Sequence, residues 1–187
     1  HGKHPLMEYP GMLTIRSAVP VDCAGIARVQ VDSYRCAYAG FFPPTYMEQF
    51  SIEEQEQDWL RLIAEHPEDI LLVAETPEHK ITGYVLAVAR PEVHPGYDAE
   101  LVALHVNKAF QRIGAGRALV RRAVELLIER GCCSVMLWTL RGNPIRGWYE
   151  RLGGELIGEK QDDIDGWTVV EVAYGWKSIL SLAAACG

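Results

Sequence analysis

The sequence of 187 residues lacks the features that mark several large classes of protein. No stretch approaches the roughly 18 consecutive apolar residues that a membrane-spanning helix requires. No tract rich in lysine or arginine occurs, and the formal net charge is −7. This balance argues against non-specific binding of nucleic acid and suits a neutral or cationic partner. We therefore expect neither a membrane nor a nucleic acid as a partner.

Cysteine and histidine also lack the spacings that build metal sites or disulfide frameworks. The six histidines are scattered, and the cysteines are odd in number with no pair at CxxC spacing. We expect no metal, and free thiols in a reducing cytoplasm. The cysteines are Cys23, Cys36, Cys132, Cys133 and Cys186.

The most informative stretch runs from Ala99 to Arg130. The apolar run Leu101–Val106 predicts a buried strand, a polar bend follows, and an amphipathic helix is expected from about Arg117 to Arg130. Gly114 and Gly116 stand where this helix begins. Main-chain N–H groups at a helix start have no intrahelical partner, and the helix dipole adds positive potential there. The stretch therefore predicts an anion site, most often one for phosphate.

The order of the other elements predicts an α/β fold with a mixed sheet and helices on both faces. The strand Leu101–Val106, its helix and the strand Ser134–Leu140 should form a right-handed parallel crossover. We expect one domain over residues 13–177, with residues 1–12 as a disordered lead or tag remnant and residues 178–187 as a tail without an assigned role. The remaining expected elements are a strand at Leu13–Arg16, a helix starting at Pro20 with Asp22 as its N-cap and ending at Gly40, a helix opened by Ser51–Glu54, a hairpin of Ile70–Ala74 with Ile81–Ala89, a loop over Pro91–Asp98, a short helix started by Asn143–Pro144, and strands at Glu155–Lys160 and Trp167–Trp176.

The glycine bend also resembles the dinucleotide fingerprint G-x-G-x-x-A, so an NAD(P)-dependent oxidoreductase is one alternative. Three features count against it, the first being that no repeated βαβ units follow. The bend from Asn107 to Gln111 separates the glycines from their strand, whereas the fingerprint follows its strand directly. The next strand ends at Arg141 without the acidic residue that would hold a ribose.

Two motifs in order carry a resemblance to a known family. The run Gln111-Arg112-Ile113-Gly114-Ala115-Gly116 matches Q/R-x-x-G-x-G/A at the start of a helix, and Asn143 leads to Trp148-Tyr149-Glu150-Arg151-Leu152-Gly153. A weaker block at Ser33–Pro43 looks like the start of a substrate loop. The sequence resembles the GCN5-related N-acetyltransferase (GNAT) superfamily, in its small bacterial form, over about Leu13 to Trp176. The implied fold is the acyl-CoA N-acyltransferase fold, with a central mixed, mostly antiparallel sheet.

The resemblance implies that acetyl-CoA is the cosubstrate and that its acetyl group moves to a primary amine by direct attack in a ternary complex. Main-chain N–H groups from Arg112 to Arg117 would hold the diphosphate, and the strand edge near Val106 would pair with the pantetheine arm. The N–H of Val106 would polarise the thioester carbonyl. The expected cofactor-binding residues are Leu104, His105, Val106, Gln111, Arg112, Ile113, Gly114, Ala115, Gly116, Arg117, Asn143 and Tyr149.

Two residues are candidates for proton transfer. Tyr149 would be the general acid for the thiolate, although it could equally be a packed aromatic residue. Glu100 would be the base for the amine, directly or through water, although a glutamate at a strand start is often a surface residue. His105 is an alternative base.

The acceptor is the least defined part of this interpretation. Tyr34 and Tyr38 are expected to bind it, unless they belong to the core face of their helix. A small-molecule amine and a peptide amine both remain open, and a homodimer is one expected assembly. A non-catalytic module that binds or senses acyl-CoA on the same fold is the main alternative to an enzyme.

Overall fold

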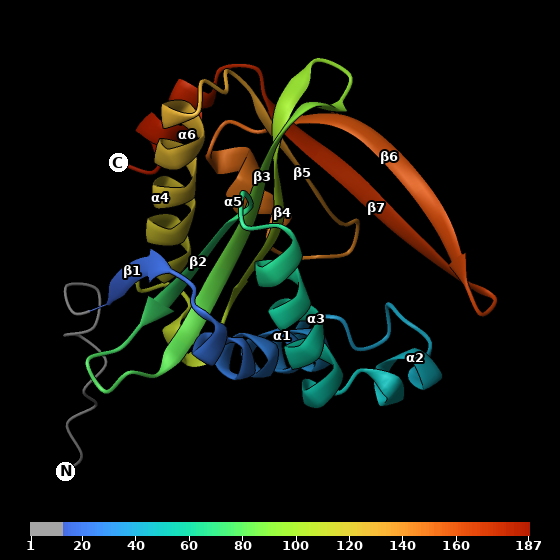
Figure 1. Cartoon of the computed structure of the whole chain (residues 1–187). Coiled ribbons are helices and arrows are strands. Elements are labelled where there is room, and N and C mark those ends of the chain that lie inside the picture. Colours follow the sequence, from blue (N-terminus) through green and yellow to red (C-terminus); the bar gives the residue numbers. More distant parts are fainter. Residues whose placement is uncertain (1–12) are drawn as a thin grey trace, which may run out of the picture.

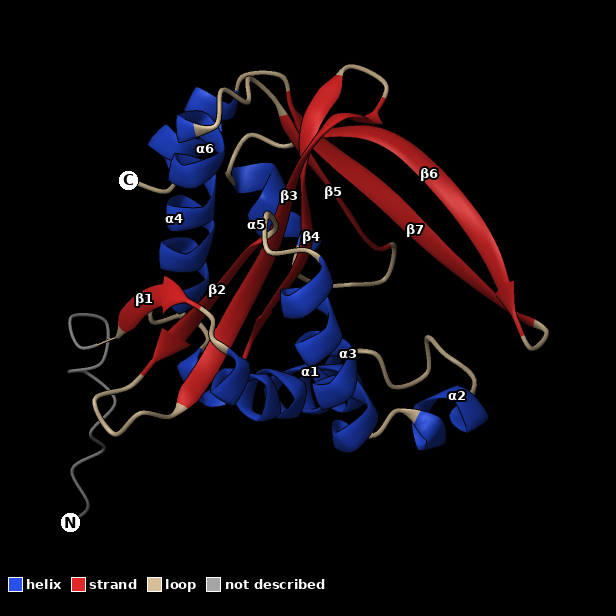
Figure 2. Cartoon of the chain, viewed as in Figure 1, coloured by secondary structure: helices blue, strands red, loops and turns tan. Residues whose placement is uncertain are grey.

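The computed structural model describes residues 13–187, except for the side chains at 91 and 92, so the lead expected at 1–12 lies outside the described residues. A mixed sheet crosses the molecule with helices on both faces (Figures 1 and 2). In the described part of the chain its strands lie in the order β1-β2-β3-β4-β5-β7-β6. Neighbours are antiparallel except β4 and β5, which confirms both the mostly antiparallel sheet and the parallel crossover. The strands are β1 Thr14–Ser17, β2 Ile70–Glu75, β3 Ile81–His94, β4 Tyr97–Val106, β5 Val135–Leu140, β6 Glu155–Ile164 and β7 Trp167–Trp176.

The helices form two groups that cover opposite faces of the sheet (Figure 1). On one face, buried residues of α4 such as Leu119, Ala123 and Leu127 pack with strand residues and with α6. On the other face, α1 and α3 pack Ile26 and Trp59 against β2 and β3. Full burial of a leucine side chain stabilises the folded state by about 1.5–3 kcal/mol, so the four-residue spacing along α4 fixes that helix on the sheet. The helices are α1 Cys23–Ala37, α2 Pro44–Gln49, α3 Ile52–Glu65, α4 Ala115–Glu129, α5 Arg146–Arg151 and α6 Ile179–Ala185, with 3₁₀ turns η2 Pro20–Asp22 and η3 Lys108–Phe110.

A β-bulge in β4 decides which side chains face which helices. Leu86 lies opposite Ala103 and Ala87 lies opposite Leu101, so Val102 is an extra residue in β4. An extra residue reverses the alternation of side chains along the strand. Leu101 therefore points to the α4 face.

The bulge has a direct consequence for the side chains expected at the site. Leu104 packs with the α4 cluster, and Ala103 packs with the α1 and α3 cluster. Glu100 pairs with Val88, and His105 with Tyr84, on the α1 side of the sheet. Simple alternation would place Glu100 on the face of Leu104; the bulge instead places it on the face of His105.

Two expected boundaries are wrong. The loop expected over Pro91–Asp98 is the continuation of the β3–β4 hairpin, with His94 opposite Tyr97. Gly96 takes a positive φ of 82° in the turn, and Tyr97 is buried. Proline and charged residues are typical of loops, so the sequence of this stretch did not predict a strand. The strand pairing here is irregular in register. The short helix α2, which begins at Pro44, was also not expected.

Of the three predicted helix starts described below, the structure confirms one and corrects two. Ser51 Oγ accepts the N–H of Glu54 at 3.2 Å, which confirms half of the capping box. Asp22 is not an N-cap by its side chain: its carboxylate accepts the N–H of Val19 at 2.8 Å and pairs with Arg16 at 2.7 Å. Asn143 lies before a turn, and α5 itself begins at Arg146.

The segment 178–187 forms α6, which packs against α4. Ile179, Leu182 and Cys186 are buried in the same cluster as the core of α4. This segment is therefore part of the folded core. No helix within residues 13–187 is long and apolar enough to cross a membrane.

Candidate active site

The site lies where β4 and β5 separate. The two strands are in register only at Glu100 and Met136 among the described residues, and beyond this point they diverge. A cavity of about 150 Å³ opens between them. Leu104 and Tyr149 line it from the α4 side, and Tyr34 and His105 line it from the α1 side. Side chains from both faces of the sheet therefore meet at this cavity.

The open edge of β4 presents main-chain groups to this cavity. The N–H of Asn107 donates to the carbonyl oxygen of Thr82 at 2.7 Å, which makes Val106 and Gly83 a non-hydrogen-bonded pair. Because the pattern alternates, the N–H groups of Val106 and Leu104 point away from β3, toward the gap. The main chain of His105 pairs with β3 instead. The structure thus corrects the expectation that His105 offers main-chain groups at the open edge, because alternate residues of an antiparallel pair turn these groups to opposite sides.

The bend after β4 is held by local hydrogen bonds. Gln111 Nε2 donates to the carbonyl oxygen of Val106 at 2.9 Å, and Asn107 Oδ1 accepts the N–H of Ala109 at 3.2 Å. Arg112 has a φ of 65° and Gly114 a φ of 94°. At the φ of Gly114 a residue with a Cβ atom would be strained, so the backbone itself favours glycine there. The side chain of Gln111 therefore braces the bend against the end of β4.

Gly116 is different, because the protein does not need a glycine there. A Cβ atom at Gly116 would lie 3.8 Å from Val106 and 3.9 Å from Trp148, which are ordinary contacts. The first hydrogen bond of α4 runs from the N–H of Ala118 to the carbonyl oxygen of Gly114 at 2.9 Å. The N–H groups of Ala115, Gly116 and Arg117 precede it and lack intrahelical acceptors. This is a bare, electropositive helix start that fits a phosphate group.

Tyr149 lies on α5 and lines the cavity. Its side chain is buried, and burial raises its pKa well above the usual value of a phenol, with Tyr38 adding to the shift. Its hydroxyl makes no hydrogen bond with another described residue, so it is available to a ligand. Asn143, below it, donates to Thr139 at 3.2 Å and to Tyr38 at 3.5 Å, and its Oδ1 accepts the N–H of Ile145 at 3.1 Å. Asn143 therefore ties the start of α5 to β5 and α1.

Tyr34 and Tyr38 form an aromatic wall at the α1 side of the cavity. Their rings meet edge to face with centroids 4.7 Å apart, and the ring of His105 lies 5.6 Å from that of Tyr34. Burial lowers the pKa of His105 to about 4, so its ring is neutral near pH 7. A neutral imidazole with so low a pKa is a weak base, which argues against His105 as the group that removes the amine proton. The hydroxyl of Tyr84, beside His105, is buried and has no hydrogen-bond partner among the described residues.

Glu100 lies just outside the cavity, where β4 and β5 still pair. It is half-buried, and burial is the main reason that its pKa is raised; Lys160 and Arg90 act in the opposite direction. The charge of Glu171 adds to the increase. Glu100 can therefore reach the cavity only through an intervening water molecule or a movement of its side chain.

Glu171 is the residue that sequence reasoning missed. It lies on β7 opposite Leu140, and its side chain lines the cavity. The signal was a single carboxylate inside the apolar run from Val169 to Ala173. Only the antiparallel pairing of β7 with β5 brings it to the site.

The comparisons with known proteins fit this geometry. Residues 31–154 match the model of the "Acetyltransferase (GNAT) family". The chain belongs to the GNAT acetyltransferase family. The uncharacterized N-acetyltransferase YuaI of Bacillus subtilis (strain 168) is 30% identical over 171 residues, which cover 91% of this chain and 96% of that protein. Mycothiol acetyltransferase of Kocuria rhizophila is 30% identical over 134 residues, which cover 57% of this chain and 44% of that protein.

Solved structures of GNAT proteins share the fold. The PaiA N-acetyltransferase of Thermoplasma acidophilum, in complex with coenzyme A, has a TM-score of 0.64 at 20% identity, covering 86% of this chain and 97% of that one. A ribosomal-protein-alanine N-acetyltransferase of Brucella melitensis has a TM-score of 0.66 at 21% identity, with coverages of 87% and 98%. GNAT membership confirms that the chain is an acetyl-CoA-dependent N-acetyltransferase. The oxidoreductase alternative is thereby set aside.

Proposed function

We propose that this enzyme joins acetyl-CoA and a primary amine in one ternary complex, with direct attack of the amine inside the cavity between β4 and β5. One observation carries the proposal: side chains from both faces of the sheet line the cavity. The phosphate-type helix start lies on the α4 side, and the aromatic wall lies on the α1 side. Two reactants can therefore enter from opposite faces and meet between the strands without a covalent acetyl-enzyme.

Acetyl-CoA would be held by main-chain groups on the α4 side. The N–H groups of Ile113 to Arg117 would bind the diphosphate, with the guanidinium groups of the exposed Arg112 and Arg117 close to it. The free N–H and C=O groups of Leu104 would pair with the pantetheine arm. Asn143 would contribute by holding α5 in place beside that arm.

The N–H of Val106 would stabilise the thioester oxygen as negative charge develops on it. One such donor, aimed in a site that excludes water, is worth about 3 kcal/mol. Gln111 supports this role because it occupies the carbonyl oxygen of Val106 and so fixes the orientation of the peptide at the strand end.

In the transfer itself, the amine nitrogen forms a bond to the acetyl carbon and the carbon–sulfur bond breaks. One proton leaves the nitrogen and one reaches the sulfur. Glu100 would accept the first proton through water, since burial raises the pKa of its carboxyl group toward that of a useful base.

Tyr149 would donate a hydrogen bond to the leaving sulfur. Burial raises the pKa of this phenol, so it stays protonated at neutral pH. A thiol has a pKa of about 8.5, below that of any phenol, so complete transfer of the tyrosine proton would be uphill. The structure therefore favours Tyr149 as a hydrogen-bond donor in the transition state, and we expect the proton from the amine to neutralise the thiolate in the end.

The finer points of assembly and location belong to the same proposal. The five cysteines are free thiols, which suits the cytoplasm. We place the catalytic domain at residues 13–187, because α6 packs into the same core as α4, and keep a homodimer as one expected assembly.

A thiol-release assay tests the function. Acetyl-CoA binding is measured by calorimetry, and release of coenzyme A is followed with a panel of primary amines and with no amine. We expect release that depends on the amine and a velocity pattern of intersecting lines, as a ternary complex requires. Parallel lines would contradict direct attack. Tight binding without release for any amine would instead support the non-catalytic module.

A further inference from the structure

We infer that the acceptor is a small primary amine with a flat apolar body and no carboxylate group, whose ammonium group is recognised by Glu171. This inference rests on the proposed function, because it names the substrate class of the same cavity. It follows from the charge, the shape and the size of the α1 side of the site.

The charge of the cavity is negative. Among the described residues that line it, Glu171 is the one with a charged side chain, and His105 is neutral. Lys160 pairs with Glu171 at 3.2 Å and lies 4.5 Å above the ring of Trp138, outside the lining. An ammonium group entering the cavity would meet the carboxylate of Glu171 and share it with Lys160, which lies outside the lining. A substrate carboxylate would instead lie beside the like charge of Glu171, whose cationic partner Lys160 is already engaged, and this arrangement is disfavoured.

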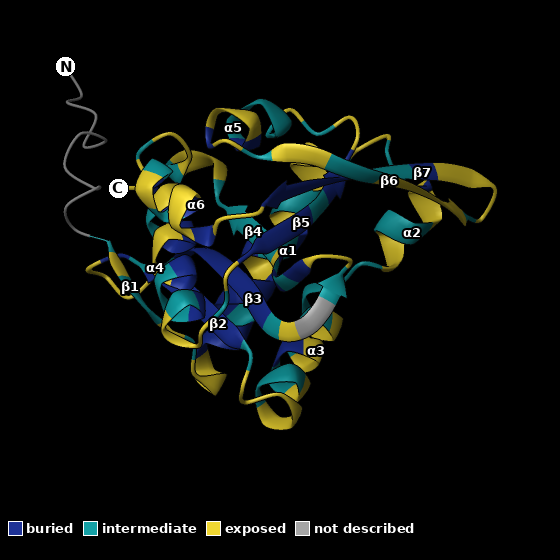
Figure 3. Ribbon diagram, turned by 90° about the horizontal axis from the view of Figure 1, so that it is seen from above, coloured by how far each residue is buried: buried dark blue, intermediate teal, exposed yellow. Residues whose placement is uncertain are grey.

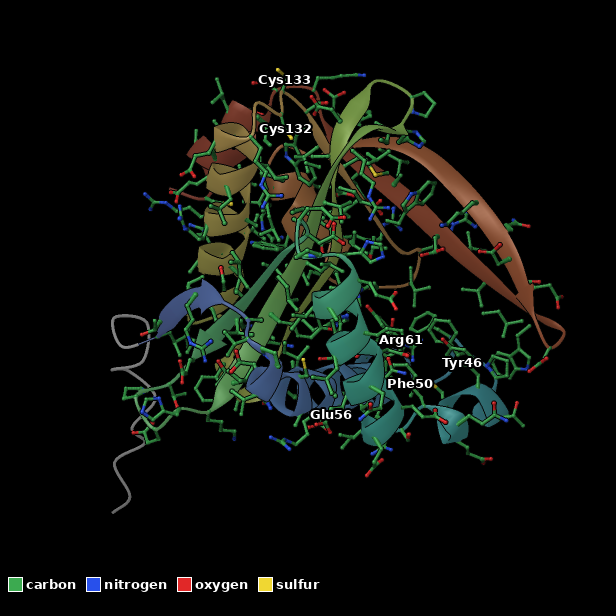
Figure 4. All side chains as sticks on the ribbon, in the orientation of Figure 1. Tyr46, Phe50, Glu56, Arg61, Cys132 and Cys133 are labelled. Atoms are coloured by element: carbon green, nitrogen blue, oxygen red, sulfur yellow. The ribbon has the colours of Figure 1, made fainter. Side chains whose placement is uncertain are left out.

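Part of the cavity wall is built from aromatic rings that pack on one another. Tyr34, Tyr38 and Phe42 line the cavity, and Tyr34 lies 6.1 Å from Phe42 between centroids. Behind them, Phe50 stacks on Tyr34 at 4.6 Å and Tyr46 stacks on Phe42 at 5.0 Å. Figure 4 shows Tyr46 and Phe50 at the α2 and α3 end of the molecule, below the β6–β7 hairpin. These supports hold the wall rigid, so it presents fixed aromatic surfaces to a flat apolar group and to a cation.

The size of the cavity limits the part of the acceptor that lies inside it. A volume of about 150 Å³ accommodates a group the size of benzene. A folded peptide segment does not fit wholly inside this space. A single ring on a short alkyl chain matches this size, and the inference places its terminal ammonium group at Glu171.

The position of Glu171 depends on the hairpin that carries it. β6 is an exposed edge strand, and the hairpin of β6 and β7 extends away from the body of the protein (Figures 1 and 3). Glu171 lies opposite Leu140 on one side and Lys160 on the other. Glu159 lies on the paired strand β6, next to Lys160, and its side chain points to the other face of the hairpin. It lies opposite Val172 and pairs with Arg141 outside the cavity. Glu159 therefore offers a matched control for the loss of one carboxylate from the same hairpin.

The first arm of the test needs no variant. The wild-type enzyme is assayed with 2-phenylethylamine and with L-phenylalanine, which differ by one carboxylate. We expect kcat/KM to be at least about 100-fold higher for the amine, because the amino acid must place its carboxylate beside the like charge of Glu171. Equal values, or a preference for the amino acid, would overturn the inference while leaving acetyl transfer intact.

The second arm locates the recognition. Glu171→Gln should raise KM for 2-phenylethylamine at least about tenfold with kcat changed less than about threefold, and Glu159→Gln should leave both constants as in the wild type. An unchanged KM in Glu171→Gln would show that Glu171 does not bind the ammonium group. If neither compound reacts but a peptide or another amine does, the inference is wrong and the proposed function stands. If acetyl-CoA binds and no amine of any class reacts, the proposed function fails, and the inference fails with it.

Discussion

Acidification should destabilise this protein through His105. The imidazole is enclosed by the rings of Tyr34, Tyr38 and Tyr84, and burial lowers its pKa to about 4 from an ordinary value of 6.5. The unfolded chain therefore binds a proton at a pH where the folded protein does not. The contribution of this residue is fully present above pH 6.5 and is lost as the pH falls through 6.5 toward 4.

The magnitude follows from the two pKa values. One pKa unit corresponds to 1.36 kcal/mol, so the shift amounts to about 3 kcal/mol when both states are protonated. Linkage gives a loss of about 2 kcal/mol between neutral pH and pH 5, and about 3 kcal/mol by pH 4. The free energy of unfolding of a typical domain is about 5–15 kcal/mol, so a loss of about 2–3 kcal/mol is a large fraction of it.

The assay compares wild type with His105→Phe, which keeps a buried ring and removes the titration. Free energies of unfolding are measured in urea at intervals from pH 7.5 to pH 4. The difference between the two proteins removes the contributions of other groups, such as Glu100, whose raised pKa acts in the opposite direction. We expect the variant to gain on the wild type by about 2 kcal/mol at pH 5.

A control variant tests whether any weakened core behaves in this way. Val31 is fully buried on α1, and Val31→Ala should lower the free energy of unfolding by about the same amount at every pH. A difference between wild type and His105→Phe that is flat from pH 7 to pH 4.5 would refute the argument. It would show that the imidazole is solvated or paired in the folded protein.

Three further predictions concern catalysis and binding. Tyr149→Phe should lower kcat by about 10²-fold with the Kd for acetyl-CoA changed less than about twofold, since it removes the hydroxyl that we propose donates to the leaving sulfur; an unchanged kcat would remove it from the mechanism. Gly116→Val should raise the Kd for acetyl-CoA, measured by calorimetry, at least about tenfold. Gly116→Ala, whose Cβ atom makes only ordinary contacts with the protein, should bind acetyl-CoA nearly as the wild type does. Equal Kd values for Gly116→Val and the wild type would contradict the role of the helix start. Glu100→Gln should lower kcat by about 10²-fold. It should also raise the free energy of unfolding at pH 7, because the raised pKa of Glu100 shows that its charged form is unfavourable in the folded protein. This gain in stability should disappear below pH 4, and urea titrations at the two pH values measure it.

The local signals of the sequence were reliable where a short segment decides its own conformation. The spacing of apolar residues along α4, the start of α3 at Ser51 and the turn at Gly131, with a φ of 85°, follow from neighbours within a few residues. The glycine bend also predicted an anion site from local residues alone. Gly114 provides the positive φ of the turn, and Gly116 leaves the main-chain N–H groups of the helix start uncovered. The same signals failed at Pro91–Asp98, where proline and charge favour a loop but cross-strand pairing continues the hairpin.

The sequence by itself determined the family, the cosubstrate and the position of the helix start that we propose binds its diphosphate, because these depend on contiguous residues whose chemistry is local. The tertiary structure alone decided which side chains lie together at the candidate site. The bulge at Val102 turns Glu100 to the face of His105, and the pairing of β7 with β5 delivers Glu171 to the cavity. Both depend on strand register between distant segments, and a shift of one residue would send each side chain to the opposite face.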